Sequence, residues 1–311
     1  MRVSELGFGA ALLGNLYEAR SDEQATDAVD AAWEGGVRYF DVAPHYGLGL
    51  AERRLGRALA GRPREQFVVS TKVGRVLEPN PAPRGSDLDI GGFAVPDALR
   101  RRRDYSAEGV RRSLHDSLER AGLDRVDVLL VHDPEEHMEQ AVHEAVPALV
   151  ALREQGVIGA VGVGMNLAEP LRRFVRETDI DVVLAAGRFT LIDRTAATLL
   201  DECAARGVSA VVAAPFNSGL LASADIPADA RFDYARAPAD VMACARACAR
   251  ICARHGVALP AAALRFGLRH PATACVLAGM GSAAEVRQNL AWLRTPIPDD
   301  LWAELPAPAR A

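Results

Sequence analysis

The sequence predicts an α/β fold, a (β/α)8 barrel, and three observations point to it. Segments typical of strands and helices alternate along the chain, eight strand–helix pairs can be counted, and no linker or shift in composition divides them. Alternation of this kind predicts parallel strands joined by right-handed helical crossovers. Eight pairs in 311 residues fit a closed barrel better than an open, doubly wound sheet. We therefore expect residues 1–311 to form one barrel domain.

The first half of the chain supplies four of the expected pairs. A poorly defined strand precedes residue 16, and Ser21 suits the N-cap position of the first helix. Further strands are expected over 37–41, 66–72 and 127–132, and helices over 22–35, 51–61, 106–122 and 137–155. Residues 74–105 are rich in Pro, Gly and Asp and are expected to be irregular. Their basic run, Arg100–Arg103, is interpreted as a solvated loop or helix start, with phosphate binding as a second alternative.

The second half continues the same alternation with a second irregular stretch, 216–238. Strands are expected over 159–164, 181–187, 209–215 and 274–279, and helices over 170–177, 196–206, 239–255, 260–270 and 283–293. The two irregular stretches fall after the third and the seventh strand. They account for the length beyond the roughly 250 residues of a minimal barrel.

Composition restricts the class of protein and of partner. The chain is 50% hydrophobic and 25% charged, as is usual for a soluble globular protein. A net charge of -5 and a pI of about 5.9 provide no basic field for nucleic acid or an anionic membrane. We find neither an apolar run of transmembrane length nor a signal peptide, so a cytoplasmic protein with a small-molecule substrate is expected. The sequence leaves a monomer and a homodimer open.

Three of the five cysteines, Cys244, Cys248 and Cys252, recur every four residues on one face of an expected helix. This spacing would present thiols to a metal, but small apolar side chains buried along an alanine-rich helix explain it as well. We interpret the cysteines as packing residues and expect no metal site.

Lys72 is the only lysine in the chain, although lysine and arginine together number 36. It closes an apolar, β-branched run, Phe67–Lys72, that reads as a strand. Lysine is a compact charge that shifts its pKa readily, whereas arginine is a planar fork that stays charged. A lysine retained against this bias indicates a chemical role, and a chance surface lysine is the alternative.

Other polar residues stand where further expected strands end. Asp41 ends the second strand, His132 ends the fourth, Asn166 follows the fifth, and Tyr46 lies in the loop after Asp41. In barrels of this kind the carboxyl ends of the strands and the loops that follow them form the active site. These residues are therefore expected to meet Lys72 at one mouth. Singly, each has another explanation: a loop cap for the aspartate, packing for the tyrosine, a core position for the histidine.

Together these residues suggest a proton-transfer site. A free tyrosine has a pKa near 10, and a neighbouring ammonium lowers that pKa by favouring the phenolate. We expect Lys72 to do this for Tyr46, Asp41 to keep Lys72 charged, and His132 to donate a hydrogen bond to the reacting oxygen.

At these residues the sequence resembles the aldo-keto reductase family. Residues 39–47 are similar to its GxxxFDTAxxYG signature, and 70–72 and 131–134 are similar to its lysine and histidine strands. Residues 161–166 are similar to its GVSN element, and the resemblance covers 5–295. It implies that Tyr46 is the general acid/base, that Lys72 and Asp41 tune it, and that His132 contacts the substrate oxygen. It also implies a nicotinamide cofactor, NAD or NADP.

Within the family, four segments of the sequence are similar to those of the bacterial D-threo-aldose 1-dehydrogenases, also called L-fucose dehydrogenases. The segments concerned are 43–50, 85–89, 186–190 and 216–221. The resemblance implies oxidation of the anomeric hydroxyl of a free aldose to a lactone. Pyridoxal 4-dehydrogenation and NADPH-dependent carbonyl reduction are alternatives within the family. Outside it, Lys72 suggests a Schiff-base lyase, and a non-catalytic binding subunit is a further alternative.

The expected cofactor contacts are Asn166, Phe216, Gly279, Gly281, Ser282, Glu285 and Asn289. The run 279–282 stands directly before a helix, which suits a pyrophosphate or a ribose phosphate. Glu285 would accept hydrogen bonds from ribose hydroxyls and repel a 2′-phosphate, so NAD is expected to be preferred, although nearby Arg287 leaves NADP open. Two departures concern the nicotinamide ring: Ala186 stands where many members place glutamine, and a usual tyrosine is missing near 213–214.

The expected substrate contacts are His45, Asp133, Arg188 and Asn217. All four lie in loops on the active face, where a sugar needs several hydroxyl partners. For Arg188 a salt bridge is an equal alternative.

Overall fold

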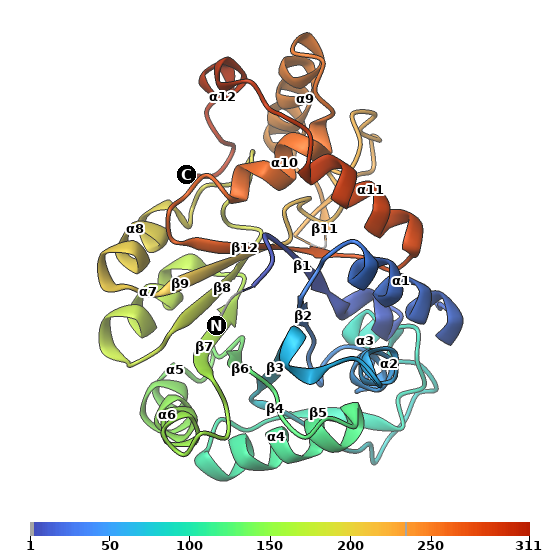
Figure 1. The fold of residues 1–311 in the computed structure, drawn as a ribbon, viewed down its shortest axis with the longest axis vertical. Helices are drawn as coiled ribbons and strands as arrows, with labels where there is room; N and C mark the ends of the chain where they lie inside the picture. Colours follow the sequence, from blue (N-terminus) through green and yellow to red (C-terminus); the bar gives the residue numbers. More distant parts are fainter. Residues whose placement is uncertain (1–2, 234) are drawn as a thin grey trace.

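The computed structural model describes residues 3–233 and 235–311, and its centre is a closed barrel of eight parallel strands (Figure 1). Around the barrel the strands follow the order β1-β12-β9-β8-β7-β6-β3-β2. Their bounds are β1 Leu6–Gly9, β2 Tyr39–Asp41, β3 Val68–Val73, β6 Val128–His132, β7 Ala160–Met165, β8 Val182–Ala186, β9 Ser209–Ala213 and β12 Thr273–Gly279. The predicted (β/α)8 barrel is confirmed.

Helices cover the outside of the barrel. The α-helices are α1 Asp22–Glu34, α2 Leu50–Leu59, α3 Leu88–Gly91, α4 Ala107–Ala121, α5 Met138–Gln140, α6 Val146–Glu154, α7 Ala168–Glu177, α8 Ala197–Arg206, α9 Ala239–Arg254, α10 Leu259–Gly267, α11 Ala283–Leu293 and α12 Asp299–Glu304. Shorter turns of helix are η1 Ala10–Gly14, η2 Arg64–Gln66 and η3 Ala141–Ala145. Among residues 3–233 and 235–311, no helix is both long and apolar enough to cross a membrane.

The strands are apolar because both of their faces are covered. All six residues of β3 are buried, including Lys72, as expected for a parallel strand between a filled barrel and a layer of helices. Inside the barrel, a cluster that includes Leu130, Leu184 and Leu277 fills the space between the strands. The barrel is therefore a packed core, and chemistry is confined to its ends.

Local capping fixes where the helices begin. The Ser21 side chain accepts a hydrogen bond from Gln24 N, and the Gln24 side chain accepts one from Ser21 N, which together form a capping box. Ser106 caps α4 by accepting from Gly109 N at 3.0 Å. Both serines were predicted helix starts.

The expected irregular stretch 74–105 contains secondary structure that the sequence did not reveal. β4 Arg75–Pro79 and β5 Leu99–Arg103 pair antiparallel as a hairpin, and α3 lies between them in the chain. The prediction that Arg100–Arg103 is a loop or helix start is wrong, because the run pairs with β4 and Glu78 bonds both Arg100 and Arg102. The second long loop likewise contains a short hairpin, β10 Arg231–Phe232 and β11 Ala235–Arg236.

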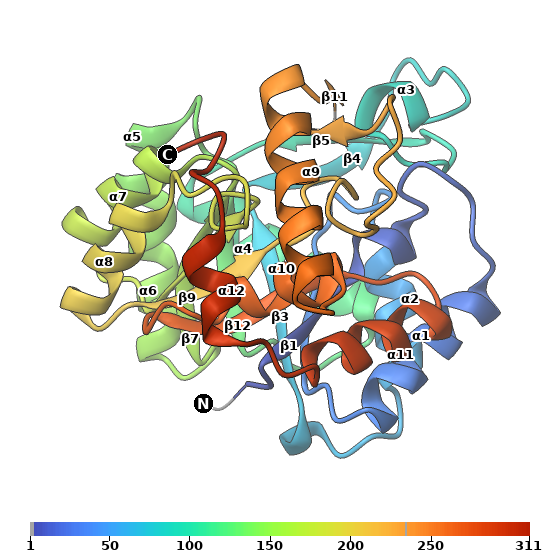
Figure 2. The ribbon, with the colours of Figure 1, turned by 90° about the horizontal axis from the view of Figure 1, so that it is seen from above.

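Both long loops lie at one end of the barrel. Figure 2 shows β4, β5, α3 and β11 on the side away from the N-terminus, where the carboxyl ends of the barrel strands open. The predicted insertions after the third and seventh strands are thus confirmed, and they surround the mouth.

The predicted helix 137–155 is present but is not regular. It passes through α5, a π-helical turn at 141–145, and α6. Pro147 stands near the start of α6 and has no N–H to bond a preceding carbonyl, which favours a change of hydrogen-bond register at this point.

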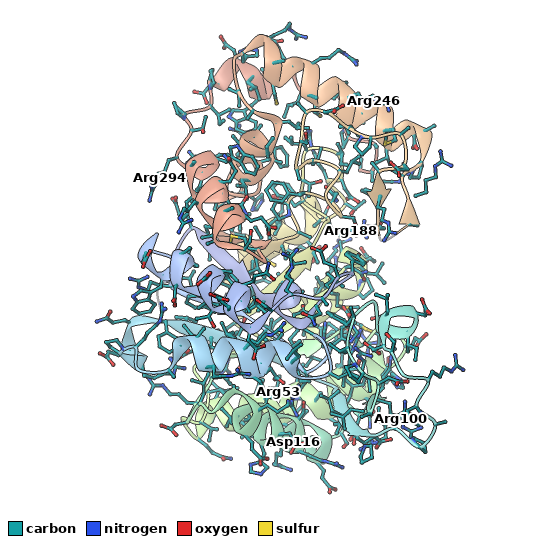
Figure 3. All side chains as sticks on the ribbon, turned by 90° about the vertical axis from the view of Figure 1, so that its right-hand side faces the viewer. Arg53, Arg100, Asp116, Arg188, Arg246 and Arg294 are labelled. Atoms are coloured by element: carbon teal, nitrogen blue, oxygen red, sulfur yellow. The ribbon has the colours of Figure 1, made fainter. Side chains whose placement is uncertain are left out.

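Arginines occupy widely separated parts of the surface. Arg53 on α2, Arg246 on α9 and Arg294 after α11 lie far apart (Figure 3). Many exposed arginines pair with acids, as Arg173 does with Glu139 and Glu177. The large arginine content is thus distributed among many local ion pairs.

Candidate active site

The carboxyl ends of the barrel strands open into a pocket of about 360 Å³. Its lining includes Tyr46, Lys72 and His132, which the sequence placed at one mouth, together with Asn166. Asp41 lies just beneath, bonded to Lys72. The five polar residues expected to converge are therefore together.

Tyr46 is held by a close contact between two loops. A Cβ on Gly14 would lie 2.6 Å from Tyr46 C, and one on Gly47 would lie 2.3 Å from Gly14 O. Gly47 also has a φ of 61°, a conformation that glycine adopts without strain. Ala51 N donates to Tyr46 O at 3.2 Å, so the loop is tied to the start of α2. The backbone that carries the phenol is fixed on both sides.

Lys72 Nζ lies at the centre of a short hydrogen-bond network. It donates to Asp41 Oδ2 at 2.6 Å, to Val42 O at 3.1 Å and to Tyr46 Oη at 3.2 Å. Burial lowers the pKa of the ammonium, but the charge of Asp41 and the contact with Tyr46 outweigh it, so the net pKa is raised. Lys72 is therefore protonated at neutral pH.

The pKa of Tyr46 departs from the sequence-based expectation. Burial raises it, and although the charge of Lys72 lowers it, the net pKa lies above the ordinary value of 10.0. Lys72 lowers the pKa of Tyr46 as expected, but in the free enzyme the desolvation of the phenolate raises this pKa by more. Tyr46 is therefore protonated at rest.

Two residues that the sequence interpretation missed support Asp41 from inside the barrel. Ser70 Oγ donates to Asp41 Oδ1 at 2.7 Å and lies 2.9 Å from Tyr39 Oη. Since the serine proton goes to the carboxylate, the Tyr39 hydroxyl donates to Ser70. A chain of four hydrogen bonds thus joins Tyr39, Ser70, Asp41, Lys72 and Tyr46.

His132 is buried and neutral. Burial, followed by the charges of Arg75 and Lys72, lowers its pKa well below the ordinary value of 6.5. Its Nδ1 is buried without a partner among the described residues, and its Nε2 lies 3.4 Å from Asp133 Oδ2, too far for a good hydrogen bond. A satisfied core histidine would have its ring nitrogens paired, so this geometry favours a role toward a ligand.

The backbone at His132 is held by Tyr105, which was not predicted as part of the site. Its hydroxyl lies 2.7 Å from His132 O and 2.8 Å from Asp133 O. Asp133 has a φ of 43°, an unfavourable conformation for a residue other than glycine. Tyr105 therefore stabilises the turn that aims His132 into the pocket.

Residues expected to contact a cofactor fall into two groups. Asn166 lines the pocket together with Leu184 and Ala186, and its carboxamide makes no hydrogen bond within the described chain. A free carboxamide beside an apolar wall fits the amide and the flat ring of a nicotinamide. Phe216, in contrast, lies edge-on against Trp292, with ring centroids 6.1 Å apart, and is not part of the pocket lining.

The second group lies at the start of α11. Ser282 caps the helix by accepting from Glu285 N at 3.2 Å, and Glu285 Oε2 accepts from Gly281 N at 2.7 Å. A Cβ on Gly279 would meet only Leu12, at 3.9 Å, so the backbone there is open to a ligand. Asn289, further along the helix, is buried. The open glycine backbone fits a phosphate-bearing cofactor.

Two of the four expected substrate contacts line the pocket: His45 and Asp133. Arg188 does not line it, because its guanidinium donates to Asn166 O and pairs with Asp193 and Asp233. The salt-bridge alternative for Arg188 is thus the one that the geometry favours. Asn217 is buried outside the pocket lining and donates to Gly187 O at 3.1 Å.

The two long loops bring residues to the pocket and its rim that no sequence motif predicted. Phe93 lies 6.1 Å from the Tyr46 ring and pairs through its backbone with Leu16, beside Tyr17. Tyr17 in turn lies under Arg231 of β10, at 5.4 Å. Both long loops thus meet residues 15–17 at the rim, a contact between segments too distant in sequence to be inferred from local pattern.

Comparison with known proteins gives consistent results along the chain. A model of the aldo/keto reductase family matches residues 5–308. The chain is 46% identical over 308 residues to a D-threo-aldose 1-dehydrogenase from Pseudomonas sp, covering 98% of this chain and 94% of that one. It is 38% identical over 326 residues to a pyridoxal 4-dehydrogenase from Microbacterium luteolum, with the same two coverages. Among solved structures, the holo form of an aldo-keto reductase from Bacillus halodurans is similar, with a TM-score of 0.77, 25% identity, and coverage of 97% of this chain and 91% of that one.

Proposed function

The chain belongs to the aldo/keto reductase family of nicotinamide-dependent oxidoreductases, and from this premise we propose that it is an aldose 1-dehydrogenase. It would oxidise the anomeric hydroxyl of a free aldose of the L-fucose or D-threo type to the aldonolactone. One observation carries the proposal: the bonded group Asp41, Lys72 and Tyr46 stands at a pocket mouth in a chain 46% identical to a D-threo-aldose 1-dehydrogenase.

In this reaction Tyr46 acts as the general base. As a phenolate, Tyr46 accepts the proton of the C1 hydroxyl. The Lys72 ammonium, 3.2 Å from Tyr46 Oη, stabilises the negative charge of that phenolate. Asp41 holds Lys72 in its charged form and, through Ser70, in a fixed position. Because Lys72 and Asp41 are both buried, the attraction between Lys72 and the phenolate is little screened by water.

His132 orients the sugar. Its ring is neutral, so one ring nitrogen donates a hydrogen bond while the other accepts one. A donor beside Tyr46 would bind the C1 oxygen and hold its proton toward the phenol oxygen. His45 and Asp133, which line the same pocket, are proposed to bind further hydroxyls.

The nicotinamide cofactor, when bound, accepts hydride from C1. We propose that Asn166 holds the carboxamide of its ring and that the backbone at Gly279 and Ser282 holds its phosphates, while the Gly281 N–H is donated to Glu285 and positions that carboxylate. Glu285 would favour NAD over NADP, because a carboxylate accepts hydrogen bonds from ribose hydroxyls and repels a 2′-phosphate. Phe216 and Asn289 remain weaker proposals, since Phe216 packs on Trp292 and Asn289 is buried in α11.

Pyridoxal 4-dehydrogenation is a second candidate, supported by the 38% identity to a pyridoxal 4-dehydrogenase. In its cyclic hemiacetal form pyridoxal offers the same C–H and O–H pair as an aldose, so the same four residues would serve. A Schiff-base lyase is disfavoured, because the protonated Lys72 is held by Asp41, Val42 O and Tyr46. A protonated amine is not a nucleophile.

A substrate panel tests the proposal. L-fucose, D-arabinose, L-galactose and pyridoxal are each assayed with NAD and with NADP by absorbance of the reduced cofactor. Oxidation of at least one aldose, abolished in Tyr46→Phe, is the expected result. Oxidation of pyridoxal alone would replace the sugar with the second candidate, and silence on every compound would overturn the dehydrogenase proposal.

A further inference from the structure

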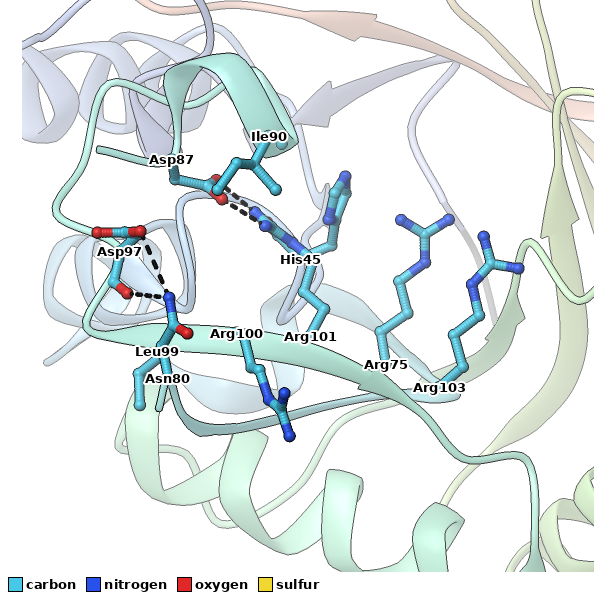
Figure 4. Close-up of a pocket in the computed structure, with 11 residues that line it drawn as sticks. His45, Arg75, Asn80, Asp87, Ile90, Asp97, Leu99, Arg100, Arg101 and Arg103 are labelled. Atoms are coloured by element: carbon cyan, nitrogen blue, oxygen red, sulfur yellow. Dashed lines mark hydrogen bonds and ion pairs between the residues drawn. The ribbon is translucent and has the colours of Figure 1, made fainter. Parts of the chain in front are cut away.

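A second cavity, of about 290 Å³, lies against one face of the β4–β5 hairpin (Figure 4). His45 and Gly91 line both spaces, so the cavity adjoins the proposed substrate site. Its charged lining consists of four arginines and two aspartates: Arg75, Arg100, Arg101, Arg103, Asp87 and Asp97. The function proposed above uses none of these groups.

Strand geometry brings three of the arginines to the same face of the hairpin. Arg103 pairs with Arg75 across the two strands, and Arg101 is two residues from Arg103, so all three side chains leave the hairpin on one side. Figure 4 shows the guanidinium groups of Arg75 and Arg103 next to each other. Arg102 leaves on the other side, where it bonds Glu78 and Asp104 and does not line the cavity.

The aspartates do not neutralise this face. Asp87 accepts two hydrogen bonds from Arg101, both at 2.7 Å, so its charge is used by one arginine. Asp97 accepts from the backbone N–H groups of Arg84 and Gly85, at 2.7 and 2.8 Å. On this face three arginines, Arg75, Arg101 and Arg103, therefore stand against the two aspartates, whereas Arg100 leaves the hairpin on the side of Arg102 and bonds Glu78.

The counter-ions of Arg75 and Arg103 lie outside the lining. Arg103 pairs with Glu136, whose side chain is 72% exposed, and exposed ion pairs are weak. Arg75 pairs with Asp133 of the active-site pocket at 2.5 Å. The guanidinium groups of Arg75 and Arg103 therefore have N–H donors that could bind the oxygens of an anionic ligand.

Several buried nitrogen atoms at the cavity are unsatisfied, among them two guanidinium donors. Arg75 Nε, Arg101 Nε and His45 Nδ1 have no hydrogen-bond partner among the described residues. The two arginine Nε groups are donors, and unpaired buried donors are costly and call for an acceptor. Burial, and then the charges of Arg75 and Arg101, lower the pKa of His45 to about 2, so this histidine adds no charge of its own.

We propose that this cavity binds an anionic group, a carboxylate or a phosphate, carried by the aldose at the end remote from its C1 hydroxyl. The planar guanidinium fork matches the paired oxygens of either group. His45 links the cavity to the pocket of Tyr46, so one sugar would extend from the oxidised carbon to the arginines. The identity of the sugar end rests on the proposed function, whereas the anion site rests on the cavity alone.

The test has two arms, each run on wild type, Arg103→Gln and Arg102→Gln. Arg102→Gln removes the same charge from the same strand on the face away from the cavity and is the matched control. In the first arm, binding of inorganic phosphate is measured by titration calorimetry without sugar or cofactor, at constant ionic strength. In the second arm, kcat/KM is compared for L-galactose, L-galacturonate and L-galactose 6-phosphate, which keep the D-threo configuration at C2 and C3.

Wild type is expected to bind phosphate saturably and to use an anionic sugar at least about tenfold better than L-galactose. Arg103→Gln should weaken phosphate binding and lower the anionic-to-neutral ratio by about tenfold, while Arg102→Gln should match wild type. Phosphate binding that depends on Arg103, without any advantage for anionic sugars, would mean a separate anion and would overturn the substrate assignment. Equal behaviour of the two variants in both arms would overturn the site. If no sugar is oxidised, the proposed function fails, and the calorimetric arm still decides on the cavity.

Discussion

Lys72 Nζ lies 2.6 Å from Asp41 Oδ2, and the two side chains are only 2% and 3% exposed. A buried pair of this kind adds little net stability, because desolvation offsets the attraction, although removing one partner costs about 3–5 kcal/mol. Stability alone therefore does not explain the pair. Its value lies in holding a positive charge 3.2 Å from the Tyr46 oxygen.

Lys72→Arg should lower kcat about 100-fold or more, the scale expected when acid–base catalysis is lost. The variant retains the charge, but the planar fork is bulkier and cannot occupy the same three hydrogen bonds, so it should misplace Tyr46. Steady-state kinetics measure the loss, and circular dichroism checks that the barrel still folds. A variant with near wild-type kcat would contradict the role assigned to Lys72.

The pH dependence should differ between the two directions of reaction. Because the pKa of Tyr46 is raised above 10.0, the phenolate is scarce at neutral pH, and kcat/KM for aldose oxidation should rise with pH up to at least about 10. The reverse direction, reduction of the lactone, needs the protonated phenol and should be flat over pH 6–9. Lys72→Met, which removes the charge that lowers this pKa, should move the oxidation profile to still higher pH. A flat oxidation profile in wild type would exclude Tyr46 as the base.

Ser70→Ala should reduce kcat while leaving the catalytic residues themselves intact. The substitution leaves Asp41 Oδ1 without its donor at 2.7 Å and orphans the Tyr39 hydroxyl, at a cost in stability of about 1–3 kcal/mol. Because Asp41 is then held less firmly, Lys72 is positioned less precisely beside Tyr46. The pH profile of oxidation should therefore shift. Tyr39→Phe is the matched control, because it removes a hydroxyl from the same chain but keeps the bond from Ser70 to Asp41. A role in packing alone would give both variants wild-type pH profiles.

The contrast between Ser70 and the hairpin shows what the sequence could reveal. Asp41, Lys72 and His132 were predictable because parallel strands of a barrel bring their carboxyl ends to one mouth. Ser70 could also have been predicted, because it lies two residues before Lys72 in the same strand and its side chain therefore points to the same face. The β4–β5 hairpin carried none, since a run of four arginines lacks the alternation of apolar and polar residues that marks a strand. Its pairing joins residues that are 20 to 28 positions apart in the sequence.

The protein should lose stability as the pH falls below about 6.5. The pKa of His45 is lowered to about 2 and that of His132 lies well below 6.5, so both stay neutral in the folded chain. Below pH 6.5 the unfolded chain binds more protons at these residues, and the free energy of unfolding falls by up to about 1.4 kcal/mol per pH unit for each. The contribution is fully present above that pH.

Thermal unfolding between pH 7 and pH 5 measures this loss. His45→Gln should make the decline of Tm with pH shallower, whereas His115→Gln, at an exposed position on α4, should leave it as in wild type. Equal slopes in all three proteins would show that His45 is not kept neutral by the fold.

Glu285→Gln should raise kcat/KM for NADP about tenfold, with little change for NAD. The carboxylate lies at the start of α11, where Oε2 accepts from Gly281 N at 2.7 Å and Oε1 is 4.0 Å from Arg20 Nη2. Glutamine keeps an oxygen for the Gly281 N–H but removes the charge that would repel a 2′-phosphate, a difference of about 1.4 kcal/mol for a tenfold effect. Glu18→Gln is the control, because Glu18 also pairs with Arg20, at 2.6 Å, but lies outside α11. If both variants changed the NADP-to-NAD ratio equally, the selectivity would come from the position of Arg20, and a wild type that already prefers NADP would remove the role of Glu285 altogether.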